Sequence, residues 1–387
     1  MLNIFRNVFE DVYLPSQSFL PRVSIYVNTA TGSDSNNGLS AGAAKLSLDG
    51  ARTALEALGG VGTIKVTAAE AMPVQGFVNF ATGRITVEGL NGVTWHCQRT
   101  TTIAVGAGGW TSLGGGVYSR TSTQSTALWY VTTLADGNGF QTVLTEETGT
   151  PTTPGAGEFG YVSTTLYVHL PGDVDPNLHQ FKRANTSYLI RASGTAKLTI
   201  KNMVGRYSNG TICELASATA ELTVRDSVVE YANGNCVGDS AAGIGYCSNV
   251  ITRRALNDGF NVNLGRWVLD YCTGEYNDDE GASPHQTAQL TINGGRYHHN
   301  GHGGITAVNS SVLNLYNVTV DYNGATGPSQ GERGGINYLT TSSGICRDCV
   351  SQNNTGEGFN CTTSGLVTVT NLTSGTGQGN TLADDAC

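Results

Sequence analysis

Acidic, amide and histidine side chains are concentrated between residues 277 and 302. Three consecutive carboxylates stand there, Asp278, Asp279 and Glu280. His285 follows them, and residues 298–302 hold three of the seven histidines of the chain. Carboxylates and imidazoles are the side chains that most often donate and accept protons in enzymes. We therefore expect any acid–base chemistry of this protein in this stretch.

Three kinds of chemistry suit these residues. Paired carboxylates about 5 Å apart cleave glycosidic bonds with retention, and a wider pair does so with inversion. A carboxylate or histidine could instead abstract the proton α to a uronate carboxyl group, with Arg333 or a bound cation stabilising the enediolate. Neither reaction requires a cofactor. Asp278, Asp279 and Glu280 also offer the hard oxygen ligands that Ca²⁺ prefers, although EF-hand spacing is absent. A fourth interpretation stays open, in which these side chains occupy solvated turns and catalyse nothing.

The elements that position these residues follow from a repeat in the second half of the chain. Short strand-like tripeptides recur from Leu198 to Val369, with spacings of 24, 23, 22, 23, 23, 31 and 23 residues. The one long spacing contains a turn-rich insertion at residues 324–333. A period near 23 without helical stretches is typical of a parallel β-helix, and such connections are right-handed. The reference position of the eight coils is occupied by Ile200, Val224, Cys247, Leu269, Ile292, Leu315, Cys346 and Val369.

Three further columns support this register. Two residues after the reference, the chain favours Asn or Asp, which tolerate left-handed turns. That column is Asn202, Asp226, Asn249, Tyr271, Gly294, Asn317, Asp348 and Asn371. A second turn column, which is tolerable inside only if its amides bond one another, is Asn277, Asn300, Asn323 and Asn354. A glycine column precedes residues expected to point inward, namely Phe260, Ala282, Ile305 and Phe359.

The register places the polar residues of successive coils next to one another, so that they form one candidate site. Asp258, Glu280 and Glu357 occupy the same position of their coils, and the first two lie on adjacent coils. Aromatic side chains could stack on sugar faces beside them. The candidate catalytic residues are Asp258, Asp279, Glu280, His285, His302 and Arg333. The candidate substrate-binding residues are His299, Glu332, Glu357, Trp267 and Tyr297.

Composition excludes several classes of protein. The 387 residues carry 30 acidic and 21 basic side chains, a net charge of −9, so a nucleic-acid binder is not expected. No apolar run reaches the roughly 18 residues of a membrane span. The nine cysteines are expected mainly as small buried side chains. Cys213 and Cys236 could form a bridge, and Cys387 could form an intermolecular disulfide. Residues 1–14 have an amphipathic pattern and do not read as a secretory signal.

The first half of the chain resembles a known family. Residues 25–40, which contain Tyr26-Val27 and the run Gly32-Ser33-Asp34-Ser35-Asn36-Asn37-Gly38, are similar to the opening of pectate-lyase-like β-helix proteins. In that family the segment precedes a capping helix, for which residues 48–58 are suitably amphipathic. Residues 59–66 and 83–89 resemble first coils, and residues 157–177 resemble a β-rich insertion. The resemblance implies a right-handed parallel β-helix of the kind found in secreted bacterial enzymes and phage tailspikes.

These observations lead to one expectation and two alternatives. We expect an all-β, phage tailspike-like virion protein, a homotrimer that binds and could depolymerise a host surface polysaccharide. The alternatives are a non-enzymatic structural or decoration protein of a virion and a secreted bacterial polysaccharide lyase. We expect four regions. Residues 1–22 form a segment that docks on other virion proteins, and residues 23–190 hold the N-terminal cap, the first coils and the β-rich insertion. Residues 191–375 form the regular β-helix, and residues 376–387 form a C-terminal tail.

Overall fold

The computed structural model describes residues 23–67, 77–98, 100–104, 106–122, 129–147, 149–184, 186–325, 334–362 and 366–380. The proposed docking segment at 1–22, Glu332, Arg333 and Cys387 lie outside these ranges.

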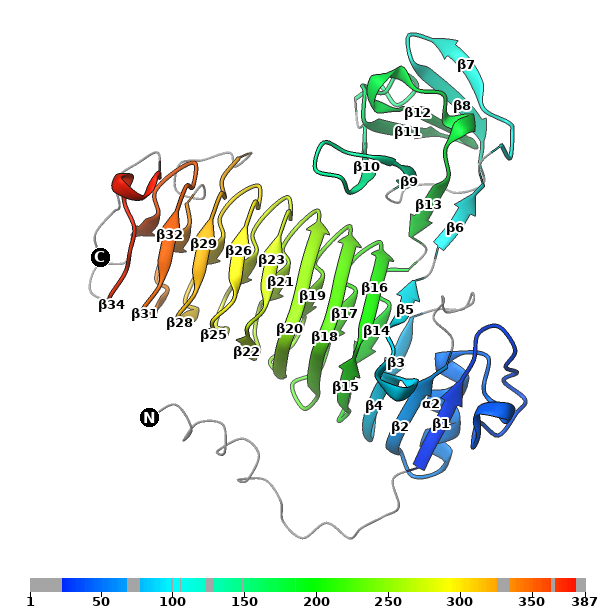
Figure 1. Ribbon diagram of the computed structural model, residues 1–387, viewed down its shortest axis with the longest axis horizontal. Coiled ribbons are helices and arrows are strands. Elements are labelled where there is room, and N and C mark those ends of the chain that lie inside the picture. Colours follow the sequence, from blue (N-terminus) through cyan, green and yellow to red (C-terminus); the bar gives the residue numbers. More distant parts are fainter. Residues whose placement is uncertain are drawn as a thin grey trace.

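The described chain winds into a right-handed parallel β-helix whose coils stack into a rod (Figure 1). Each coil contributes strands to three faces. Face 1 consists of β1 (Val23–Val27), β2 (Val61–Val66), β4 (Arg84–Gly89), β15 (Lys197–Lys201), the first halves of β18 (Glu221–Ala232) and β20 (Ile244–Ala255), β22 (Arg266–Asp270), β25 (Gln289–Asn293), β28 (Val312–Tyr316), β31 (Ser343–Arg347) and β34 (Val367–Thr370).

Faces 2 and 3 complete each turn of the helix. Face 2 consists of β5 (Trp95–Gln98), β16 (Met203–Ser208), the second halves of β18 and β20, β23 (Thr273–Glu275), β26 (Arg296–His298), β29 (Thr319–Asp321) and β32 (Val350–Gln352). Face 3 consists of β3 (Val78–Phe80), β14 (Ile190–Ala192), β17 (Cys213–Leu215), β19 (Val237–Asp239), β21 (Phe260–Val262), β24 (Ala282–Pro284), β27 (Ile305–Ala307), β30 (Ile336–Tyr338) and β33 (Phe359–Cys361).

The predicted register is confirmed. Strand pairing on face 1 aligns all eight reference residues, from Ile200 to Val369. Seven of them are fully buried, and only Val369, in the last strand of this face, is 40% exposed. Three earlier strands extend the same column with Ile25, Ile64 and Val87. The apolar repeat therefore builds one continuous core along the rod.

Both predicted turn columns are confirmed. All eight residues of the first column have a positive φ, between 48° and 69°. The second column is a buried asparagine ladder, in which each amide Nδ2 donates to the Oδ1 of the next asparagine. The distances are 3.0, 2.9 and 3.0 Å along Asn277, Asn300, Asn323 and Asn354, and the ladder continues to Asn380 at 3.0 Å. Mutual bonding makes these buried amides tolerable.

A short helix closes the N-terminal end of the rod, as predicted. Helix α2 (Leu48–Ala57) begins at the N-cap Ser47, whose hydroxyl accepts from the Gly50 amide. Its buried residues Leu48, Ala51 and Leu55 belong to the core of the first coils.

The inserted domain (residues 100–184) is larger than the β-rich insertion predicted at 157–177. Eight strands form one sheet that stands away from the rod between β5 and β14 (Figure 1). They are β6 (Thr100–Ile103), β7 (Thr111–Gly114), β8 (Val117–Thr121), β9 (Trp129–Ala135), β10 (Gln141–Glu146), β11 (Glu158–Val162), β12 (Thr165–His169) and β13 (Phe181–Ala184). The domain has its own core, in which Trp110 and Trp129 pack against Phe181.

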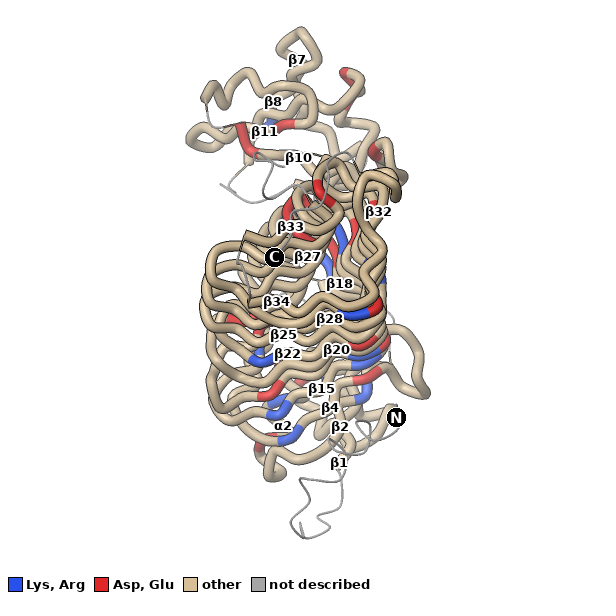
Figure 2. Tube along the Cα trace, turned by 90° about the vertical axis from the view of Figure 1, so that its left-hand side faces the viewer, with Lys and Arg blue, Asp and Glu red and all other residues tan. Residues whose placement is uncertain are grey.

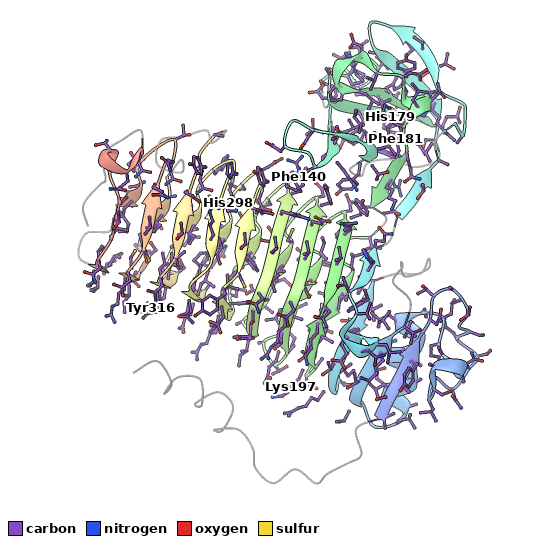
Figure 3. The ribbon with its side chains drawn as sticks, viewed as in Figure 1. Phe140, His179, Phe181, Lys197, His298 and Tyr316 are labelled. Atoms are coloured by element: carbon purple, nitrogen blue, oxygen red, sulfur yellow. The ribbon has the colours of Figure 1, made fainter. Side chains whose placement is uncertain are left out.

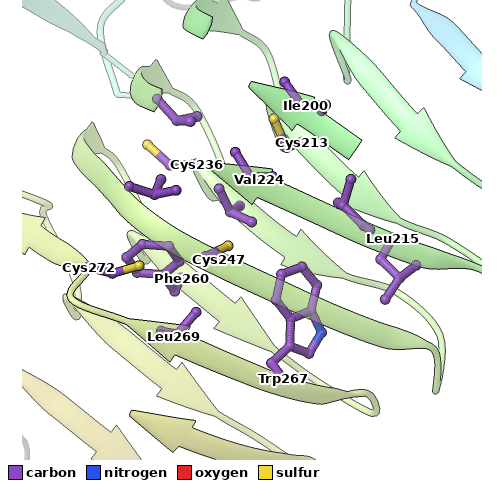
Figure 4. Close-up of a cluster of buried hydrophobic side chains, with 14 of the residues drawn as sticks. Ile200, Cys213, Leu215, Val224, Cys236, Cys247, Phe260, Trp267, Leu269 and Cys272 are labelled. Atoms are coloured by element: carbon purple, nitrogen blue, oxygen red, sulfur yellow. The ribbon is translucent and has the colours of Figure 1, made fainter. Parts of the chain in front are cut away.

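The described cysteines are mostly core residues, as expected (Figure 4). Seven are free and buried, and burial raises the pKa of Cys97 to about 12. The bridge between Cys213 and Cys236 does not form. Cys213 pairs with Val237, so Cys236 lies one position out of register with it. Cys361 is disulfide-bonded.

Candidate functional site

The candidate acids lie on one edge of the rod, in the turns that lead from face 2 to face 3. Asn277 and Asn300 start two successive turns and anchor them inside through the ladder. The predicted glycine column ends the turns that lead into β21, β24, β27 and β33. At Gly281 a Cβ would lie 2.7 Å from the Gly304 backbone oxygen, so only glycine allows the coils to approach this closely. The edge is therefore a rigid stack of short turns.

Three carboxyl groups meet at this edge. Asp258 and Glu280 lie on adjacent coils, as the register predicted, and the Glu280 amide donates to Asp258 Oδ1 at 3.3 Å. The Glu280 carboxyl group is in hydrogen-bonding contact with both Asp258 and Asp279. Glu280 is 7% exposed and Asp258 is fully buried, whereas Asp279 is accessible.

The environment of Glu280 favours the protonated form of its carboxyl group. Burial raises its pKa well above the usual range, and the charges of Asp258 and Asp279 raise it further. Two carboxylates at hydrogen-bonding distance cannot easily both be ionised, so the proton is retained on the group with the most costly charge. Glu280 is consequently a hydrogen-bond donor and a potential proton donor.

Each outer carboxylate has an imidazole beside it. His302 Nδ1 lies 2.5 Å from Asp279 Oδ1, and His285 Nε2 lies 3.7 Å from Asp258 Oδ2. The Ser283 hydroxyl is 2.8 Å from the same His285 nitrogen. The predicted catalytic residues, apart from Arg333, thus form one chain of titratable groups with Glu280 at its centre.

The candidate metal ligands differ from those predicted. Among the described residues, Asp279, Glu280 and His302 offer ligand atoms within 4.8 Å of one another, and Asp278 does not join them. Burial raises the pKa of Asp278, while Arg254 opposes that rise. Ca²⁺ takes six to eight oxygens, and a set of two carboxylates and one imidazole fits it poorly. Such a set suits a transition-metal ion better.

The raised pKa of Glu280 makes a prediction about stability. Between the unfolded and the folded pKa the folded protein holds the extra proton, so the free energy of unfolding falls as pH rises through this window. Glu280→Gln removes that loss, and we expect it to be more stable than wild type at about pH 8 and no different at about pH 4. Urea unfolding at both pH values measures this. A variant that is less stable at the higher pH would contradict it.

The prediction that Trp267 and Tyr297 bind substrate is wrong. Trp267 is 2% exposed, and its indole Nε1 donates to the buried Asp239 Oδ2 at 2.8 Å. Its ring fills the space left by Gly245, where a Cβ would lie 1.9 Å from the ring. Tyr297 is fully buried in the core as well. Neither ring can reach a sugar from solvent.

His299 and Glu357 are the two other predicted substrate-binding residues that the structure describes. His299 stacks between Tyr276 and Tyr322, with ring centroids 4.8 and 5.1 Å apart. Glu357 lies three coils beyond Glu280 in the strand register and does not join the group around it.

Alternating charges line the outer side of face 2 near the edge (Figure 2). Arg206 and Arg253 both pair with the buried Glu230. Arg253 also pairs with Glu275 at 3.4 Å, and His298 Nε2 is 3.2 Å from Glu275. His298 lowers the pKa of Glu275. Most charges on this face therefore have a partner in the neighbouring coil.

Sequence reasoning missed the contribution of the inserted domain. Asp136, in its β9–β10 hairpin, pairs with Arg254 at 2.7 Å, and Arg254 interacts electrostatically with Asp278. Phe140 from the same hairpin packs against Tyr276 at 5.0 Å (Figure 3). The domain thus reaches the edge that carries the acids. No motif in residues 100–184 signals this contact.

Comparisons with known proteins identify the fold. No protein-family model matches the sequence, and a search of curated proteins finds no match. The complex of XylC with xylose aligns with a TM-score of 0.61 at 12% identity, over 87% of this chain and 68% of that one. A structure described as a glycoside hydrolase aligns with 0.59 at 10% identity, over 90% and 96%. The tailspike of Pseudomonas phage phi297 aligns with only 0.29 at 9% identity, over 84% and 66%.

At these identities the likeness shows the fold alone, which is the parallel β-helix described above. The likeness does not show what the protein does. Among the described residues, no helix has the length and apolar character of a membrane span.

Proposed function

We propose that this protein binds a polysaccharide at the edge between faces 2 and 3 and hydrolyses it, with Glu280 as the general acid. The observation that carries this proposal is the buried Glu280, whose carboxyl group is in hydrogen-bonding contact with two carboxylates and has a raised pKa. Glycosidases need one carboxylic acid with a raised pKa to protonate the leaving oxygen and one ionised partner.

Accessibility assigns the roles of the two partners. Asp279 is accessible and is paired with His302, so it is the carboxylate that can reach the anomeric carbon. Asp258 is fully buried and is held by the Asn261 side-chain amide. It is a positioning residue, which fixes Glu280 and maintains its proton.

Hydrolysis is favoured over the lyase alternative by charge. A lyase must neutralise the uronate carboxyl group as the α-proton leaves. The arginine that interacts with Asp278 is already paired with Asp136, and the two side chains in hydrogen-bonding contact with the Glu280 carboxyl group are both carboxylates. Two structural neighbours with a TM-score above 0.5, one bound to xylose and one described as a glycoside hydrolase, are consistent with saccharide chemistry on this fold.

The separation of the acids predicts the stereochemical outcome. Ligand atoms of Asp279 and Glu280 lie within 4.8 Å, and their carboxyl groups are in hydrogen-bonding contact. This separation is nearer to the roughly 5–5.5 Å of retaining enzymes than to the roughly 6.5–9.5 Å of inverting enzymes, so we expect the anomeric configuration to be retained. Proton NMR of the first-formed product measures it. Initial release of the inverted anomer would contradict the assignment of Asp279.

Cleavage itself is tested on purified capsular and O-antigen polysaccharides and on plant xylans. We expect new reducing ends without absorbance near 232 nm. Products that absorb at 232 nm would indicate a lyase. No cleavage of any polymer by the intact protein would favour the non-enzymatic alternative, in which the β-helix is a rigid virion component.

The virion setting is a further part of the proposal. We infer a tailspike-like appendage, extracellular and trimeric, from the family resemblance of residues 25–40. Light scattering during size-exclusion chromatography tests the trimer. A monomer would contradict the appendage assignment and favour a secreted enzyme, while leaving the chemistry at Glu280 untouched.

A further inference from the structure

One column of side chains continues from Glu280 toward the C-terminal end of the rod. The register of face 3 aligns Phe260, Ala282, Ile305, Ile336 and Phe359. The residues two positions earlier therefore share one place on the edge. This acidic column is Asp258, Glu280, Gly303, Gly334 and Glu357. Glu280 and Glu357 are three coil steps apart, about 14 Å, with only glycines between them.

A second column runs beside the first, three residues later in each coil. Its members are the middle residues of the face 3 strands, whose neighbours on both sides point into the core. They are all polar and buried, although they lie on the outer side of the sheet. This floor column is Asn261, Ser283, Thr306, Asn337 and Asn360.

Two buried oxygens of these columns lack a hydrogen-bond donor. Asn337 is 0% exposed, and its Nδ2 donates to Thr306 Oγ1 at 3.0 Å while its Oδ1 has no partner. Glu357 is 9% exposed, and its Oε2 has no partner either. A Cβ at Gly334 would lie 2.4 Å from Asn337 Oδ1, so only glycine fits beside that buried oxygen. A buried acceptor without a donor costs about 1–3 kcal/mol, which a ligand could recover.

The chemistry of these oxygens defines what they bind. Both are acceptors, one belongs to a carboxyl group, and the same edge carries Asp258, Asp279 and Glu280. Hydroxyl and ammonium groups are donors that suit such a surface, whereas a uronate would meet negative charge of its own sign. An oligosaccharide lying along the coils would reach Glu357 from Glu280.

We propose that Glu357, with the buried Asn337 beside it, forms a second sugar subsite, which selects neutral or amino sugars and rejects uronic acids. This inference rests on the proposed function, because it places the cleaved bond at Glu280. It makes the glycan run along the rod from the hairpin of the inserted domain toward β33.

Binding tests the subsite independently of cleavage. Titration calorimetry of the Glu280→Gln protein uses three probes: chitosan tetraose, xylotetraose and tetragalacturonate. We expect the amino and neutral tetraoses to bind and tetragalacturonate to bind at least about tenfold more weakly. Adding Glu357→Gln should weaken chitosan tetraose about tenfold and xylotetraose less, because one charge-assisted hydrogen bond is lost.

The matched control is Glu221→Gln, on the outer side of face 1, which should leave all three affinities unchanged. Equal effects of Glu357→Gln and Glu221→Gln would overturn the subsite. So would tetragalacturonate binding as tightly as chitosan tetraose, or no binding of either donor-rich tetraose. Each of these results leaves the cleavage proposal standing. If the wild-type protein cleaves no polysaccharide but the tetraose selectivity is intact, only the proposed hydrolysis is overturned.

Discussion

Glu280→Gln is expected to abolish polysaccharide cleavage, with the initial rate of reducing-end release falling about a thousandfold. Glutamine preserves the shape of the side chain and its hydrogen bonding to Asp258 and Asp279, but it has no proton of suitable acidity to give to the leaving oxygen. General acid catalysis contributes about 10²–10⁴ in rate, and this substitution removes all of it. Rates at saturating and at low substrate concentration separate kcat from KM, and the loss should appear in kcat.

Glu221→Gln again serves as the control, since it removes a carboxylate from face 1 and should keep the wild-type rate. Retention of activity within about threefold by Glu280→Gln would remove Glu280 from the mechanism.

Asn300→Ala is expected to destabilise the protein strongly, at about 3–5 kcal/mol of unfolding free energy. Asn300 is fully buried. Its Oδ1 accepts from the amide and the side chain of Asn277, and its Nδ2 donates to Asn323 Oδ1 and to the Gly274 carbonyl. Truncation leaves two donors of Asn277 without an acceptor inside the core, and each unmet group carries its full desolvation cost.

Asn314→Ala on the outer side of β28 is the matched control, because the side chain is half-buried and points away from the core. We expect it to cost less than about 0.5 kcal/mol. Urea unfolding followed by circular dichroism measures both. A cost below about 1 kcal/mol at Asn300 would mean that the ladder contributes little to holding the edge together.

The coil register was predictable because β-helix strands repeat a buried apolar residue at one position of every turn. Ile200 and its seven equivalents show that repeat directly in the sequence. The same register predicted that Asp258 and Glu280 would be neighbours. It also implied the burial of Trp267, which stands two residues before the inward Leu269 and therefore on the same side of the strand. Because side chains alternate along a strand, Trp267 must point inward like Leu269, and the prediction of an exposed indole was wrong for this reason.

The 23-residue period could not predict other features of the site. Asp279 and His302 meet because of turn conformations, and a 23-residue period carries no information about turn dihedrals. The contact between Asp136 and Arg254 joins the inserted domain to the rod across 118 residues of sequence. The inserted domain has no repeat, so neither its extent nor its docking followed from the pattern.

The central claim is that water cleaves a glycosidic bond at Glu280. Digestion of an active polysaccharide in H₂¹⁸O, followed by mass spectrometry of the products, tests it most directly. We predict one ¹⁸O atom at each new reducing end and no unsaturated sugar. Products that lack the label and are 20 mass units lighter than the ¹⁸O-labelled hydrolytic products would be unsaturated, and they would contradict the account by showing β-elimination.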